Sequence, residues 1–250
     1  GRFDEARDLL RVFAACVKNG IVPNLLDGAG RPRYNSRDSS WWWLQALQSL
    51  YRKLDVEGRA ALLRSKVPRL FPPQKGSVSG VSSLGDIVQE ILQSHATGVS
   101  LHDDGIDYDM TREGFEVNVS LDLKTGLLFG GNSHNCGTWM DKLGSSDAAG
   151  NRGVPATPRD GSAVEIAGLL KSSLRWLGEL SAQGLFPHAG VSLELARKNF
   201  LTWDEWSQLL ISSFERLFYV PLDPAEDRNY FIDQAMVHRR GIFKDSYGSS

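Results

Sequence analysis

The sequence has no long apolar run and no long basic run, and each absence excludes a class of protein. The longest apolar stretches are far shorter than the roughly 20 residues that span a bilayer. The first ten residues, GRFDEARDLL, carry charges of both signs and do not resemble a signal peptide. Lys and Arg number 28 against 30 for Asp and Glu, so a nucleic-acid backbone would find little attraction. We therefore expect a cytoplasmic protein that binds neither membranes nor nucleic acid.

Cysteine and histidine are also scarce. Cys16 and Cys136 lie in apolar surroundings without CxxC spacing, which favours buried free thiols over a disulfide or a zinc site. The five histidines are scattered, with no HExxH and no pair at helical spacing. Motifs for a serine elbow, a P-loop and a Rossmann dinucleotide site are missing as well. The sequence predicts no metal and no cofactor, and LHDDGIDYDM (101–110) is interpreted as a solvated acidic loop because it lacks the final glutamate of a calcium loop.

What is present is ordinary globular composition. The chain has 250 residues, of which 41% are hydrophobic and 23% charged, enough for one large domain with a substantial core. It begins without Met, and apolar residues recur at helical spacing from Phe3 onward. We interpret it as a piece of a longer polypeptide.

Most of the periodic segments predict helices. The first is expected over Phe3 to Lys18, ending at Asn19-Gly20. A second is expected over about Trp41 to Lys53, with Asp38 or the serines after it as N-cap. After a breaker-rich linker over 70–83, an apolar stripe from Leu84 to Leu92 predicts a third.

Two S/T-x-x-E patterns mark the start of later helices. Ser162 with Glu165 and Thr202 with Glu205 each precede an apolar stripe of helical spacing, so both are predicted to be capping boxes. The stretch 115–131 alternates apolar and polar residues around Lys-Thr-Gly, which predicts a β-hairpin. It is the only strong strand signal, so we expect helices joined by long loops with one inserted hairpin.

Three consecutive tryptophans, Trp41, Trp42 and Trp43, open the second helix. Successive helical positions turn by about 100°, so at least one indole is expected to face a cleft or another subunit. An indole face suits the C–H face of a sugar ring, and Arg37 with Asp38 could hold hydroxyl groups. The alternative is that Asp38 only caps the helix and the tryptophans belong to the core.

Asp141 follows Trp139 and Met140 directly. Apolar neighbours penalise a charged carboxylate, so Asp141 is a candidate general acid, although a structural role is an open alternative. Arg159 and Asp160 stand just before a predicted helix, where ligands rich in hydroxyl groups or negative charge are often held. Asp160 is open between capping and ligand contact.

Three stretches together resemble the glucosidase half of eukaryotic glycogen debranching enzymes. They are NGIVPNLLDGAGRPRYNSRDSSWWW, GGNSHNCGTWMDKLGSSDAAGNRGVPATPRDGSAVEI and RRGIFKDSYGSS. The second is long and unusual, and the resemblance extends over essentially the whole chain, with 54–96 the least characteristic part.

The resemblance implies a mainly α fold, an (α/α)6 toroid of helix pairs with the active site among the loops at one end. Residues 1–250 would form part of one such glucosidase domain, with the inserted β-hairpin, and the toroid would be incomplete at its C-terminal end. The N-terminal 4-α-glucanotransferase domain of the family would also be absent. The protein partner that the resemblance implies is therefore the rest of the chain's own polypeptide.

The resemblance also implies an activity and its residues. The family hydrolyses the α-1,6-linked glucose at glycogen branch points with inversion, so glycogen or phosphorylase limit dextrin is the implied substrate. Asp141 matches the family's proton donor and Trp139 a sugar platform beside it. The residues implied to contact the glucose are Arg37, Asp38, Trp42, Arg159 and Asp160.

One departure affects the expected activity. The family's catalytic base is a glutamate in a Gly-Pro-Glu-Trp segment, and this chain contains no Gly-Pro-Glu. An inverting glycosidase needs two carboxyl groups, so we expect the 250 residues alone to be inactive. Two alternatives stay open: another (α/α)6 glycosidase, such as a relative of glucoamylase or trehalase, and a non-catalytic glucan-binding module.

Overall fold

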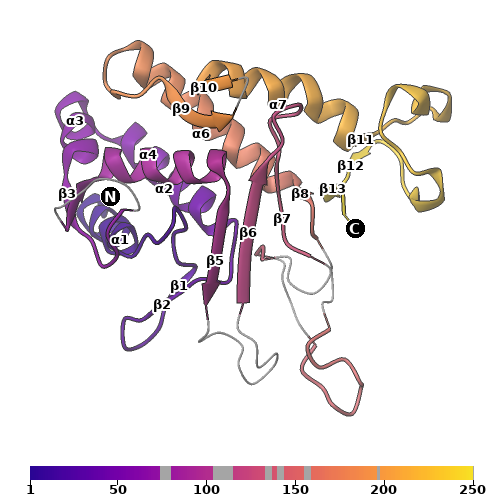
Figure 1. The fold of residues 1–250 in the computed structure, drawn as a ribbon, viewed down its shortest axis with the longest axis horizontal. Helices are drawn as coiled ribbons and strands as arrows, with labels where there is room; N and C mark the ends of the chain where they lie inside the picture. Colours follow the sequence, from indigo (N-terminus) through magenta and orange to yellow (C-terminus); the bar gives the residue numbers. More distant parts are fainter. Residues whose placement is uncertain are drawn as a thin grey trace.

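A computed structural model describes residues 1–73, 80–103, 115–132, 137–139, 144–154, 159–195 and 198–249 (Figure 1). Its helices are α1 (Phe3–Ala15), α2 (Ser39–Lys53), α3 (Val56–Arg64), α4 (Leu84–Thr97), α6 (Val164–Ala182) and α7 (Trp203–Phe218). Two short 3-10 helices, η1 (Pro224–Asn229) and η2 (Gln234–Met236), follow. Among these helices, α2, α6 and α7 pack side by side in that order, and α1 packs on α2.

The strands are short and form small antiparallel sheets. One three-stranded sheet has the order β5 (Val99–Asp103), β6 (Phe115–Leu121), β7 (Leu128–Gly130), and α4 packs against β6. A longer hairpin joins β9 (Gly190–Leu195) to β10 (Lys198–Thr202). The remaining pairs are β1 (Leu25–Leu26) with β2 (Pro32–Arg33), β3 (Lys66–Pro68) with β4 (Val81–Ser83), β8 (Ser162–Ala163) with β13 (Ser246–Tyr247), and β11 (Tyr219–Val220) with β12 (Ile242–Phe243).

The fold class is therefore more mixed than one hairpin inserted among helices. The hairpin at 115–130 is confirmed, with Gly126 at a φ of 73° in its turn, but it belongs to a three-stranded sheet. Leu101 to Asp103, expected in a solvated loop, lie instead in the edge strand β5. The acidic residues at the end of β5 favoured the prediction of a loop. In the structure β5 pairs with β6, and its residues alternate between buried and exposed.

The first helix ends earlier than expected. It stops at Ala15, and Asn19 and Gly20 have φ angles of 51° and 77°. Lys18 and Ile21 exchange two backbone hydrogen bonds of 2.9 and 3.0 Å across them. Positive φ at both central residues is the requirement of a type I′ turn, so Asn19-Gly20 forms a tight turn and not the end of the helix.

The two predicted capping boxes have different outcomes. Thr202 and Glu205 form the box at the start of α7 as expected. The N-cap of helix α6 is Ala163, whose side chain cannot accept a hydrogen bond. The capping box predicted for Ser162 and Glu165 therefore does not form. Glu165 instead binds Arg159, and an ion pair with a buried guanidinium is stronger than a bond to one backbone amide.

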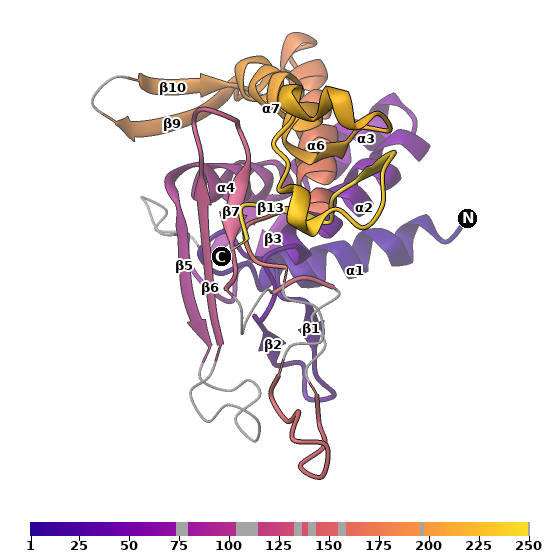
Figure 2. The ribbon, with the colours of Figure 1, turned by 90° about the vertical axis from the view of Figure 1, so that its right-hand side faces the viewer.

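The core lies between the packed helices and the three-stranded sheet. Trp41, Trp203 and Trp206 are its largest fully buried side chains. Trp206 Nε1 donates to the carbonyl of Gly126 at 2.9 Å, which fastens the β6–β7 turn to α7. Figure 2 shows the β1–β2 connection and residues 144–154 extending to the same end of the molecule, away from the β9–β10 hairpin.

Within the described ranges, no helix combines the length and apolar character needed to cross a bilayer. The same ranges hold no group of three or more His, Cys, Asp or Glu side chains placed to bind a metal ion. Cys16 is a buried free thiol, as expected, whereas Cys136 lies outside the described residues.

Candidate functional site

A cavity of about 560 Å³ opens where α1, the start of α2 and residues 138–139 meet. We call it the Trp42–Trp139 pocket after the two exposed indoles in its wall. Its volume is within the roughly 300–1,000 Å³ usual for small-molecule sites. The apolar side of its lining is Leu10, Phe13, Val22, Pro23, Trp43 and Ala46, and the polar side is Asn24, Arg33, Asn35, Ser36, Asp38, Ser39 and Thr138.

Helix α2 explains why Trp42 faces this pocket. Trp41 and Trp43 are buried in the core, whereas Trp42 keeps 46% of its surface exposed. The 100° rotation per residue cannot direct all three rings inward. The prediction that one of the three indoles faces a cleft is confirmed.

Two serines at the start of α2 hold residues 22–24, which form another part of the pocket wall. Ser39 Oγ donates to the carbonyl of Val22 at 2.5 Å, and the amide of Val22 donates to Ser40 Oγ at 2.9 Å. Next to them, the buried hydroxyl of Tyr34 donates to the carbonyl of Cys16, and burial raises the pKa of Tyr34. The pocket wall formed by residues 22–24 is thus held by α2 itself.

Asp38 does not cap α2 with its side chain, contrary to one alternative. Its buried carboxylate accepts three hydrogen bonds. Oδ2 accepts from Trp42 Nε1 at 3.2 Å and from the backbone amide of Trp139 at 2.8 Å, and Oδ1 accepts from Ser36 Oγ. A single carboxylate therefore joins the helix that bears one exposed indole to the segment that bears the other.

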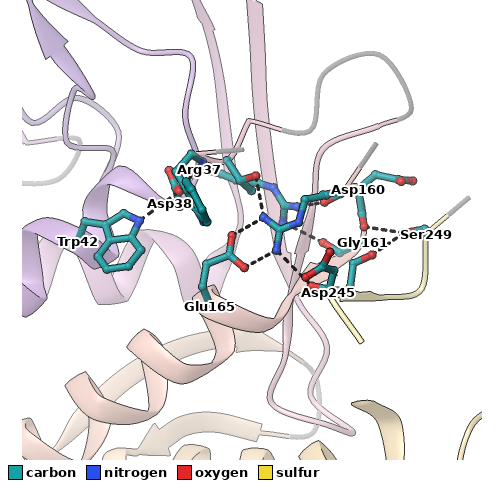
Figure 3. A network of polar contacts seen from close by, with 12 residues as sticks. Arg37, Asp38, Trp42, Asp160, Gly161, Glu165, Asp245 and Ser249 are labelled. Carbon is teal, nitrogen blue, oxygen red and sulfur yellow. Dashed lines mark hydrogen bonds and ion pairs between the residues drawn. The ribbon is translucent and has the colours of Figure 1, made fainter. Parts of the chain in front are cut away.

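Arg37 is only 2% exposed and does not line the Trp42–Trp139 pocket. Its guanidinium donates to the backbone carbonyls of Arg159 at 2.6 Å and Gly161 at 2.8 Å (Figure 3). Its own amide donates to the carbonyl of Gly137 at 2.7 Å. Arg37 thus holds together three segments that are far apart in the sequence.

Arg159 has a similar role on the other side of the network. It is 2% exposed, pairs with both oxygens of Glu165 at 2.6 Å, and donates to Thr138 Oγ1 at 3.2 Å. It also donates to the carbonyl of Asp245 at 3.3 Å. These contacts involve both terminal nitrogens of its guanidinium, Nη1 and Nη2. Arg159 does not line the Trp42–Trp139 pocket.

Asp160 lies at a different cavity, of about 390 Å³, beside the three-stranded sheet. Asn118, Asn132 and Gly161 also line it. Gly161, at a φ of 81°, exchanges two backbone hydrogen bonds with Gly130 at the end of β7. The structure thus brings Asp38, Trp42 and Trp139 together in one pocket and sets Asp160 at another. The guanidinium of Arg37 binds the carbonyls of the residues on either side of Asp160.

Asp141, the candidate general acid, lies outside the described residues. Its neighbour in sequence, Trp139, is 60% exposed in the pocket wall. Leu10 and Phe13 of α1 also line the pocket and were not predicted, because apolar residues at helical spacing indicate a buried face and not which cavity it borders. Asn24 and Arg33 were missed too, and no sequence signal marks them.

Comparison with known proteins shows the family of the chain. A family model described as amylo-alpha-1,6-glucosidase matches residues 1–250, the whole chain. The chain is also 43% identical over 264 residues to the glycogen debranching enzyme of Saccharomyces cerevisiae, of which it spans 17% of the length. That match covers 100% of this chain. On these grounds the chain belongs to the amylo-α-1,6-glucosidase family.

Proposed function

We propose that this chain is part of an enzyme that hydrolyses the α-1,6-linked glucose at glycogen branch points with inversion. The observation that carries the proposal is the Trp42–Trp139 pocket, in which two exposed indoles flank a buried carboxylate, within a chain that matches the glucosidase family over its whole length. Its substrate is glycogen or phosphorylase limit dextrin. The enzyme acts in the cytoplasm, where its substrate is stored.

In the proposed mechanism, the indoles bind the apolar faces of glucose residues. Trp42 and Trp139 are exposed enough to do so. Asp141 protonates the glycosidic oxygen. This role is proposed from the family resemblance and from the position of Asp141 two residues after Trp139 in the sequence.

The polar residues divide into two groups. Asp38 lines the pocket, and its carboxylate binds Trp42 Nε1 and the amide of Trp139, so it supports the two indoles that bind the sugar. Asp160 is available to a different part of the glucan at the neighbouring cavity. Arg37 and Arg159, which the family resemblance implies to contact glucose, support the proposal mainly by holding the loops in place.

The second carboxylate, which activates the water, comes from another part of the polypeptide. In inverting glycosidases the two carboxyl groups stand roughly 6.5–9.5 Å apart. The rest of the protein also completes the (α/α)6 toroid, to which the row of α2, α6 and α7 contributes, and supplies a 4-α-glucanotransferase domain. The 250 residues alone are inactive.

Two substrates test the linkage. The complete protein should release glucose from isomaltosyl substrates and from limit dextrin, with the β-anomer appearing first by NMR. Equal or faster cleavage of maltosyl substrates would indicate another (α/α)6 glycosidase. The isolated chain is the control, and robust glucose release from it would show that the base has been assigned wrongly.

A further inference from the structure

We propose that Asp38 is a positioning residue that fixes the indole of Trp42 relative to the backbone segment that bears Trp139 in the Trp42–Trp139 pocket. The inference rests on the proposed function, because it assigns a role in glucan binding to that pocket. It differs from a direct sugar contact, since Asp38 would act through the two tryptophans.

The hydrogen bonds at Asp38 Oδ2 carry the argument. This one oxygen accepts from Trp42 Nε1 at 3.2 Å and from the amide of Trp139 at 2.8 Å. Trp139 is 101 residues further along the chain than Asp38. Bonds to an ionised carboxylate are about twice as strong as neutral ones, so this link sets the distance between the two walls.

The two indoles need such a support because packing constrains them little. Trp42 is 46% and Trp139 60% exposed. A side chain with that much free surface can change rotamer unless a specific contact holds it, and Asp38 holds the rotamer of Trp42 through Nε1 and the backbone of Trp139 through its amide. The carboxylate is itself held, since Asp38 is 3% exposed and Ser36 Oγ donates to its other oxygen.

The competing roles of Asp38 make different predictions. As a helix cap it would bind the amides of α2, and its side chain makes no such bond. As a sugar ligand it would contribute independently of the indoles. As a positioning residue it must be coupled to them, and coupled residues give non-additive effects in a double-mutant cycle.

The test uses the complete protein and measures kcat/KM for glucose release from phosphorylase limit dextrin. In the wild-type background, Trp42→Ala and Trp139→Ala should each lower kcat/KM, roughly two- to tenfold, as expected for loss of an aromatic contact. In the Asp38→Ala background, where the side chain offers no acceptor to the two donors, each substitution should lower kcat/KM by a clearly smaller factor than in the wild type. Effects that multiply independently, or an unchanged kcat/KM for Asp38→Ala, would overturn the inference.

Ser36→Ala is the matched control. It removes the hydrogen bond to Oδ1 and the bond that Ser36 Oγ accepts from the amide of Ser39, and it leaves both bonds to Oδ2 in place. The two tryptophan substitutions should therefore keep their full effects in this background. Equal coupling in Ser36→Ala would indicate general loosening of the pocket and would contradict a specific role for Oδ2.

Trp42→Phe keeps the test open if Asp38→Ala does not fold. It retains an aromatic ring, although a smaller one, and removes the N–H that donates to Asp38. We expect kcat/KM to fall severalfold, and a wild-type value would overturn the inference. The proposed function fails separately: it fails if the wild-type complete protein releases no glucose, whatever the cycle shows.

Discussion

Arg159 and Glu165 form a doubly hydrogen-bonded ion pair, with Nη1–Oε1 and Nη2–Oε2 distances of 2.6 Å. The Arg159 side chain is 2% exposed and that of Glu165 14%. The pair fastens the segment before α6 to the helix itself, and through Thr138 it also holds the segment that leads to Trp139. The wall of the candidate site therefore depends on a charge pair that lies behind it.

Breaking this pair should destabilise the fold strongly. Glu165→Ala leaves the buried guanidinium of Arg159 without its counter-ion, which costs about 3–5 kcal/mol in buried pairs. We expect a loss at the lower end of this range, about 3 kcal/mol, in the free energy of unfolding by urea. The exposed pair of Arg152 and Asp147 is the matched control. Asp147→Ala should cost less than about 1 kcal/mol, and a similar loss for both would contradict the special position of Arg159.

The two S/T-x-x-E sequences should respond differently to alanine. Thr202 Oγ1 accepts from the amide of Glu205 at 3.1 Å, so Thr202→Ala should lower the free energy of unfolding by about 1 kcal/mol. Ser162 Oγ is buried and has no hydrogen-bond partner among the described residues, so Ser162→Ala should be neutral or stabilising. Thermal unfolding of both variants decides this, and equal losses would show that Ser162 caps α6 after all.

Stability should fall in acid through His95. This side chain is fully buried against Trp41, and burial lowers the pKa of His95 to about 4. The unfolded chain binds the proton near pH 6.5, so the stability from a neutral His95 is complete above that pH. It is lost as the pH falls toward 4, by up to about 3 kcal/mol.

His95→Gln should remove this dependence. Urea unfolding at several pH values measures it as the slope of the free energy of unfolding between pH 6.5 and 4. The slope for the variant should be shallower by an amount that corresponds to the uptake of up to one proton on unfolding. Comparison at pH 8, where His95 does not titrate, gives the cost of the substitution itself. Parallel curves for the variant and the wild type would show that His95 is not the group responsible.

The fold could be predicted from the sequence where local chemistry decides the outcome. The helix of Trp41, Trp42 and Trp43 and the exposure of one indole follow from helical rotation alone. The hairpin that ends at Gly130 follows from alternation and from a turn with Gly126 at positive φ.

Prediction failed where two local arrangements compete for the same residues. Ser162 and Thr202 begin similar patterns, but Glu165 pairs with Arg159 and does not cap the first helix. Asn19-Gly20 is compatible with both a helix end and a tight turn, and the bonds between Lys18 and Ile21 show that it forms the turn. The sequence pattern alone does not distinguish these alternatives.

The sequence predicted which residues lie near the candidate site better than it predicted their contacts. Asp38, Trp42 and Trp139 line one pocket, whereas the guanidinium of Arg37 binds backbone carbonyls. An arginine that binds a ligand and one that fastens loops have the same sequence signature. Only the positions of their partners distinguish them.

Substitution of Asp141 tests the central claim most directly. Asp141→Asn in the complete protein keeps the shape of the side chain and removes the proton that the glycosidic oxygen needs. Glucose release from phosphorylase limit dextrin should fall by about 10²–10⁴-fold, the usual contribution of general acid–base catalysis, while dextrin still binds. Turnover within a few fold of the wild type would contradict the account.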